Sequence, residues 1–132
     1  MATEYEGGCL CGAVRYKAGD VKVGAYCHCR MCQKAAGAPV IAWVIAPLTG
    51  FAWTKGKARP YRSSTGASRL FCPDCGSALA FQGDEGDWIA LTTATFDHPE
   101  GLQPRHHIFT ESQMPWLPIV DGLPRYPGDS PR

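Results

Sequence analysis

The sequence lacks an excess of charge of either sign, because 13 lysines and arginines balance 12 aspartates and glutamates and the formal net charge is +1. The chain as a whole therefore does not attract nucleic acid or anionic membranes electrostatically. It also lacks an apolar run of the roughly 18–20 residues that a membrane-spanning helix needs. The longest apolar stretch, residues 38–48, contains Pro39 and Pro47. We therefore expect neither a nucleic-acid partner nor a membrane partner.

The amino terminus lacks the features of a secretory signal. Residues 1–6 (MATEYE) contain neither a basic segment nor an apolar core. We therefore expect a cytoplasmic protein, in a compartment where thiols stay reduced.

Glycine and proline are abundant, with 15 and 11 copies in 132 residues. This composition favours many short strands and turns over long helices. Alternating apolar and polar residues predict strands at 13–17, 21–26, 50–53, 58–63, 68–72, 77–82 and 88–95. The continuous apolar run at 40–45 predicts a further strand that is buried on both faces.

One short helix is predicted at residues 30–36, where Gly37 follows as a left-handed C-cap. The length of the chain is that of one domain, which we place at residues 5–125, with a C-terminal tail at 126–132. The sequence therefore predicts a single, mainly β domain with a few helical turns.

Seven cysteines stand out in this composition. Disulfides explain them poorly, because the number is odd, the expected compartment is reducing and the cysteines lie in tight groups. Metal ligation is the better explanation.

The segment Cys72-Pro-Asp-Cys75-Gly76 is a zinc knuckle, in which two intervening residues let both sulfurs face one ion. Together with Cys9 and Cys11 it supplies four thiolates and hence a closed tetrahedral site. Spacing alone would also permit the knuckle to pair with two of the three cysteines at 27–32. A closed site is structural, and it stabilises small zinc domains by about 10 kcal/mol.

The remaining cysteines are Cys27, Cys29 and Cys32. Three protein ligands with a vacant fourth position are typical of catalytic zinc. The start of the predicted helix and Arg30 both favour thiolate over thiol here. Because three thiolates exceed the charge of the ion, such a site activates water poorly but holds a soft sulfur nucleophile well. We therefore predict thiol chemistry.

Other arrangements of these three cysteines stay open at this point. His28 could be a fourth ligand, although sequence neighbours rarely reach the same metal. His106, His107 or Asp97 could close the site from elsewhere in the chain. The three cysteines could also be reduced and free of metal.

The cysteine motifs resemble those of the glutathione-dependent formaldehyde-activating enzyme family, which includes centromere protein V. The similarity runs in order through residues 5–125 and includes all seven cysteines. Its motifs are GCLCGAVRY (8–16), CHCRMCQK (27–34) with the following GA (37–38), FCPDCGS (71–77) and the segment 107–124.

The resemblance implies a zinc-stabilised all-β fold of two short antiparallel sheets. It implies two zinc ions per chain, a structural one on Cys9, Cys11, Cys72 and Cys75 and a catalytic one on Cys27, Cys29 and Cys32. It further implies a carbon–sulfur lyase that joins glutathione to formaldehyde, giving S-hydroxymethylglutathione.

Other side chains are weaker candidates. Arg30 and Lys34, near the second cysteine group, could bind the carboxylates of glutathione. His28 could transfer a proton, and Trp116 could border a pocket. The same chemistry could serve another electrophile, or the chain could be a non-catalytic zinc module that binds a protein partner. A monomer and a homodimer are both compatible with the sequence.

Overall fold

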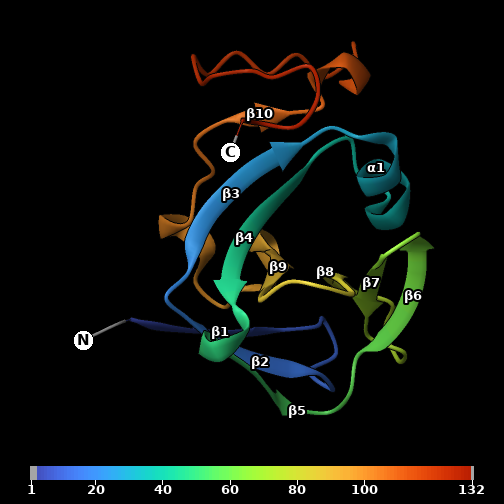
Figure 1. The fold of residues 1–132 in the computed structure, drawn as a ribbon, viewed down its shortest axis with the longest axis vertical. Helices are drawn as coiled ribbons and strands as arrows, with labels where there is room; N and C mark the ends of the chain where they lie inside the picture. Colours follow the sequence, from blue (N-terminus) through green and yellow to red (C-terminus); the bar gives the residue numbers. More distant parts are fainter. Residues whose placement is uncertain (1–2, 132) are drawn as a thin grey trace.

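The computed structural model describes residues 3–131 and shows a mainly β fold (Figure 1). Its helices are α1 (Arg30–Ala36) and the short 3₁₀ turns η1 (Leu48–Gly50), η2 (Thr93–Thr95), η3 (Pro99–Gly101) and η4 (Thr110–Ser112). The strands are β1 (Glu4–Gly8), β2 (Arg15–Gly19), β3 (Lys22–Cys27), β4 (Ile41–Pro47), β5 (Phe51–Lys55), β6 (Arg59–Ser64), β7 (Ala67–Phe71), β8 (Ala78–Gly83), β9 (Trp88–Thr92) and β10 (His107–Ile108). None of the helices in this part of the chain is both long and apolar enough to cross a bilayer.

The strands form two sheets, as expected. The smaller has the order β1-β2-β5, and the larger has the order β10-β3-β4-β9-β8-β7-β6. The larger sheet differs from the expected short antiparallel one, because it has seven strands and β10 runs parallel to β3. This parallel pair arises because the chain leaves β9 through η2 and η3 and returns beside β3 (Figure 1).

The helix prediction is confirmed at both ends. The Cys29 side chain caps α1 by accepting a hydrogen bond from the Cys32 backbone N–H, and Gly37 follows with a φ of 63°. The strand expected at 88–95 is wrong in its last third, where the chain turns into η2. β1 was not predicted, because its sequence EYEGG has little apolar alternation.

β4 is buried on both faces, as its apolar run predicts. Val44 and Ala46 pack into the main core, which the smaller sheet shares through Tyr16 and Ala18. Ile41 and Trp43 alternate with them and pack on the opposite face with the sulfurs of the second cysteine group. The larger sheet therefore separates the main core from the side on which these cysteines lie.

The C-terminal segment is hydrogen-bonded to the region of β10. The Tyr126 N–H donates to the His107 carbonyl, and the Phe109 N–H donates to the Gly128 carbonyl. The backbone contacts thus continue into the segment 126–132, which we assigned to a C-terminal tail.

One turn of the fold depends on glycine. Gly56 has a φ of 68°, and a Cβ at this position would overlap the Ala13 carbonyl oxygen. We expect Gly56→Ala to lower the free energy of unfolding by about 2–4 kcal/mol, since left-handed strain and overpacking add. Gly66, with a φ of 84° and open space around it, is the matched control and should lose only about 1–2 kcal/mol as alanine. Urea unfolding of both variants measures this, and an equal loss would contradict the steric explanation.

Candidate metal centres

The seven cysteines gather into two clusters, and in each cluster all the sulfurs lie within 4.8 Å of one another. One cluster contains Cys9, Cys11, Cys72 and Cys75, and the other contains Cys27, Cys29 and Cys32. The knuckle thus lies with the first cysteine pair and not with two of the middle three. All seven are free cysteines.

The four-sulfur cluster forms where the loops after β1 and β7 meet. Each loop turns back at a glycine in the left-handed region, Gly12 and Gly76, with φ of 81° and 78°. The Cys11 Sγ lies 3.7 Å from the Cys9 Sγ and 3.8 Å from the Cys72 Sγ. A tetrahedron of sulfurs about 2.3 Å from a zinc ion has edges of about 3.8 Å. The donor set and its spacing therefore fit zinc.

Hydrogen bonds hold the two loops of this cluster together. The Ser77 hydroxyl oxygen accepts a bond from the Leu10 backbone N–H at 3.0 Å and lies 3.2 Å from the Cys75 Sγ. The bond from Ser77 lowers the pKa of the Cys75 thiol to about 5. The Val14 N–H donates to the buried Cys9 sulfur at 3.2 Å. These bonds thus favour the thiolate forms of Cys75 and Cys9, the form in which cysteine binds a metal.

The three-sulfur cluster forms where β3 passes into α1. Cys27 is the last residue of β3, Cys29 is the N-cap and Cys32 lies in the first turn of the helix. Cys27 and Cys32 are almost completely buried, whereas Cys29 is half-buried. Cys29 is therefore the most exposed of the three cysteines.

The three thiols cannot all ionise easily without a cation between them. Hydrogen bonds from Cys27 and Cys32 lower the pKa of the Cys29 thiol to about 2. The same shared bonds, together with burial, raise the pKa of Cys27. A bound divalent cation would remove this conflict, because it favours the thiolate at every position.

None of the alternative fourth ligands joins the three sulfurs. Within residues 3–131, no further histidine, cysteine or carboxylate atom completes the group. The buried His28 ring instead bonds through Nε2 to Nδ1 of His107, at 2.8 Å. Asp97 forms a bidentate pair with Arg15 on another part of the surface.

The His28 ring is held in place by residues from the C-terminal third of the chain. His107 is fully buried, stacks on both Tyr26 and His28, and donates from Nε2 to Asp121 at 2.8 Å. This bond lowers the pKa of Asp121, and burial lowers the pKa of His28. His107 is thus part of a buried hydrogen-bond chain, and the role of Asp121 in it could not be found from its turn-like sequence context.

Gln33 is a buried polar centre of α1 that the sequence did not reveal. Its side-chain amide donates to the carbonyls of His28, Pro39 and Ser112 at 2.8, 3.2 and 3.1 Å. Its Oε1 accepts a bond from Arg30 at 2.7 Å. The cysteine loop, the end of α1 and η4 are therefore joined through one side chain.

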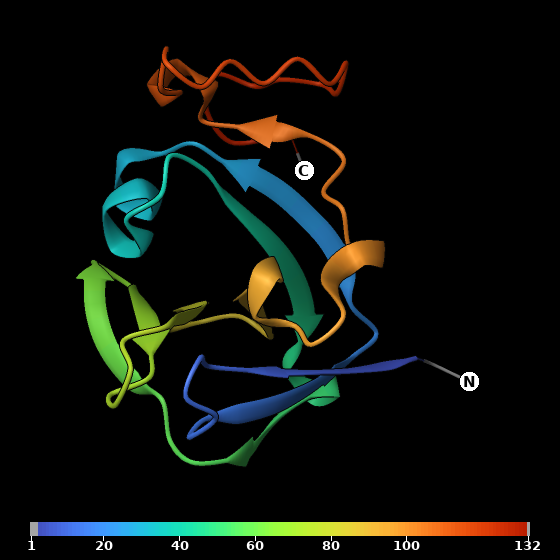
Figure 2. The same cartoon turned by 180° about the vertical axis from the view of Figure 1, so that it is seen from behind.

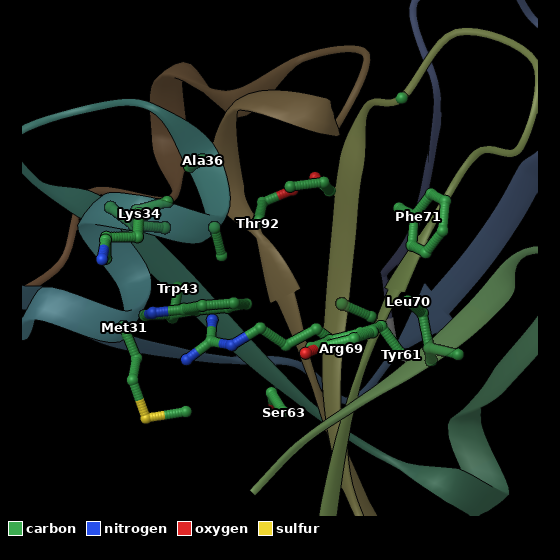
Figure 3. Close-up of a pocket in the computed structure, with 15 residues that line it drawn as sticks. Met31, Lys34, Ala36, Trp43, Tyr61, Ser63, Arg69, Leu70, Phe71 and Thr92 are labelled. Atoms are coloured by element: carbon green, nitrogen blue, oxygen red, sulfur yellow. The ribbon is translucent and has the colours of Figure 1, made fainter.

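A cavity of about 490 Å³ lies between α1 and the β6–β8 part of the larger sheet (Figure 3). Figures 1 and 2 both show α1 facing the end of β6, and residues from both elements line the cavity. Its lining includes Lys34 and Arg69 but no carboxylate. The other lining residues are Met31, Ala35, Ala36, Ile41, Trp43, Tyr61, Ser63, Leu70, Phe71, Gly76, Ala78, Ala80 and Thr92.

The two basic residues predicted from the sequence lie at these cavities. Lys34 lines the larger cavity and also a neighbouring one of about 240 Å³. Arg30 and Trp116 line only the smaller cavity. Arg69, which the sequence did not indicate, lies between the larger cavity and the three-sulfur cluster and bonds to Cys32.

Comparison with known proteins gives three similarities. The family model described as glutathione-dependent formaldehyde-activating enzyme matches residues 4–112. An uncharacterised lyase of Schizosaccharomyces pombe is 35% identical over 80 residues, which cover 59% of this chain and 57% of that protein. The crystal structure of a Rhodobacter sphaeroides protein matches with a TM-score of 0.56 and 24% identity, covering 76% of this chain and 92% of that one.

The structural similarity shows a shared fold, while the match to the yeast lyase spans little more than half of that relative's length. The family model covers most of the chain, including all seven cysteines of the two clusters. The chain therefore belongs to the glutathione-dependent formaldehyde-activating enzyme family.

Proposed function

We propose that this protein is a zinc-dependent carbon–sulfur lyase that adds glutathione, or a similar thiol, to formaldehyde or a related aldehyde. The observation that carries the proposal is the three-sulfur cluster, which has no fourth protein ligand among residues 3–131 and which Arg69 joins to the larger cavity through its contact with Cys32. Membership of the family supports the choice of thiol and aldehyde. We place this activity in the cytoplasm, where thiols stay reduced.

The two clusters have different roles in this proposal. Cys9, Cys11, Cys72 and Cys75 hold a structural zinc, since four sulfurs complete a tetrahedron and leave no position for a substrate. The other three cysteines leave one position open. A zinc ion there supplies a Lewis acid that favours the thiolate form of an incoming thiol at neutral pH.

The reaction itself needs little chemical catalysis from the protein. The thiol sulfur bonds to the carbonyl carbon, the carbonyl π electrons move to oxygen, and the proton lost by the thiol ends on that oxygen. This addition is readily reversible without an enzyme, so the contribution of the chain is to position the two reactants. Lys34 and Arg30 are suited to bind the carboxylates of glutathione at the mouth of the cavities.

The apolar lining of the larger cavity supports a second electrophile class, because formaldehyde has no apolar group for such a lining to contact. The cavity of about 490 Å³ is lined mainly by apolar side chains, with Trp43 and Phe71 among them. A larger aldehyde is therefore a specific alternative for the same thiol chemistry.

A non-catalytic role in protein binding also has one observation in its favour. Trp116, Leu117 and Val120 are exposed in one loop, by 69, 38 and 95%. Exposed apolar groups of this kind occur at protein interfaces. This alternative requires no thiol at the three-sulfur cluster, so thiol binding distinguishes the two functions.

Zinc content and stability should separate the two clusters. We expect two zinc ions per chain, and we expect Cys72→Ser to unfold the protein, because a structural zinc contributes about 10 kcal/mol and whole domains have about 5–15. Cys29→Ser should stay folded with close to one zinc per chain. Elemental analysis and circular dichroism measure both, and the reverse pattern would exchange the assigned roles.

Glutathione should bind the zinc-loaded protein with release of a proton, because the thiol enters as thiolate. Calorimetry in two buffers of different ionisation enthalpy counts that proton. S-methylglutathione, which cannot form a thiolate, and Cys29→Ser are the controls and should show no proton release.

The lyase step is then measured by exchange NMR between glutathione and S-hydroxymethylglutathione. Wild-type protein should accelerate the exchange and Cys29→Ser should not. If the protein binds neither glutathione nor S-methylglutathione, the proposal is wrong and the protein-binding alternative is favoured.

Replacing Lys34 by glutamine should weaken glutathione binding about fivefold, because an exposed ion pair with a carboxylate contributes up to about 1 kcal/mol. Lys57→Gln is the matched control, since Lys57 is exposed and lies outside both cavities. Calorimetry at low and high salt compares them. An equal effect of both variants would indicate a general charge effect and not a binding role for Lys34.

A further inference from the structure

The Arg69 side chain faces the three-sulfur cluster from the far side of the larger cavity. Its two Nη atoms lie 3.7 and 3.6 Å from the Cys32 Sγ. The guanidinium packs over the ring of Phe81, its neighbour on β8, 5.3 Å from the centroid. Figure 3 shows the side chain extending from β7 toward Trp43 and α1. Arg69 thus connects the β7–β8 wall of the cavity to the cysteine helix.

Arg69 has a different kind of hydrogen-bond partner from Arg15 and Arg62. Arg15 and Arg62 form bidentate pairs with Asp97 and Asp84. The hydrogen bonds of Arg69 go to a sulfur, and its buried Nε has no partner. Partial burial of a charge is costly unless an opposite charge lies close by. The sulfur cluster is the group that can supply that charge.

The net charge of the three-sulfur site with a bound ion indicates a role for Arg69. A divalent ion with three thiolates carries one net negative charge, which repels a further anion. The guanidinium would cancel that charge when a divalent ion is bound, so a substrate thiolate would approach a neutral centre.

We propose that Arg69 is a positioning residue that selects a thiolate, and not a neutral molecule, as the fourth ligand of the three-sulfur site. This inference rests on the proposed function, because it assumes that a thiol enters that site.

A direct role in binding the carboxylates of glutathione fits the geometry less well. The guanidinium is already held between Cys32 and Phe81, and its Nε is enclosed. The Lys34 side chain, in contrast, is exposed and borders both cavities. Its ammonium group is free to turn toward a carboxylate, as a flexible point charge does.

Cobalt(II)-loaded protein provides a test that does not depend on turnover, since thiolate ligation gives a charge-transfer absorption band. The spectrum of cobalt-loaded Cys29→Ser is subtracted to remove the four-sulfur cluster. Titrations use glutathione, 2-mercaptoethanol, which has no carboxylate, and imidazole, which is neutral. In Arg69→Met we expect about tenfold weaker binding of both thiols, as expected for loss of a nearby charge, and unchanged imidazole binding.

Two variants serve as controls. Arg62→Met removes an arginine from the neighbouring strand and should leave all three affinities unchanged. Arg69→Lys keeps the charge without the fork of donors, and should restore part of the thiol affinity while leaving imidazole unaffected. Thermal melts of each variant establish that the fold is retained.

Each contrary result has its own meaning. Weaker binding of glutathione alone would make Arg69 a carboxylate ligand, and equal loss of imidazole would make its role one of packing; either result overturns the inference. Equal thiol binding by Arg69→Met and wild type overturns it as well and leaves the proposed function intact. If neither thiol changes the cobalt spectrum of the wild type, both the inference about Arg69 and the proposed function are overturned.

Discussion

Repulsion between thiolates whose sulfurs lie within 4.8 Å of one another is the constraint on which this molecule depends. Distances of 3.7 and 3.8 Å between sulfurs of the four-cysteine cluster match the edges of a zinc tetrahedron, and they are unfavourable for ionised thiols without a cation. In the other cluster the conflict appears as opposite pKa shifts on Cys29 and Cys27. The loops after β1 and β7 meet at the four-cysteine cluster, so a cation there would join segments that are far apart in the chain.

β4 supplies the second constraint, because both of its faces are buried. Val44 belongs to the main core, and its neighbour Trp43 packs beside the three-sulfur cluster. A register shift of one residue would exchange the two faces. It would place an indole in the main core and a smaller side chain at the site. β4 therefore positions the three-sulfur cluster on one face and packs into the main core on the other.

Local chemistry decided what could be predicted from the sequence. The cysteine spacing, the helix at 30–36 and its Gly37 cap depend on neighbouring residues, and all of them were found. β1 was missed because EYEGG gains its strand geometry only by pairing with β2. Arg69 and Asp121 were missed because their partners, Cys32 and His107, are 37 and 14 residues away. Nothing in the local sequence marks such contacts.

Contacts of His28, which lies between two of the cysteines, keep its ring away from the three-sulfur cluster. His28 is adjacent to Cys27 and Cys29, yet its ring is 1% exposed and bonded to His107. Turning it toward the sulfurs would leave the His107 nitrogen buried without a partner, at a cost of about 1–3 kcal/mol. His107 is itself held by Asp121, from the C-terminal segment. The last part of the chain thus keeps a nearby imidazole away from the position that, in the proposed function, the substrate thiol takes.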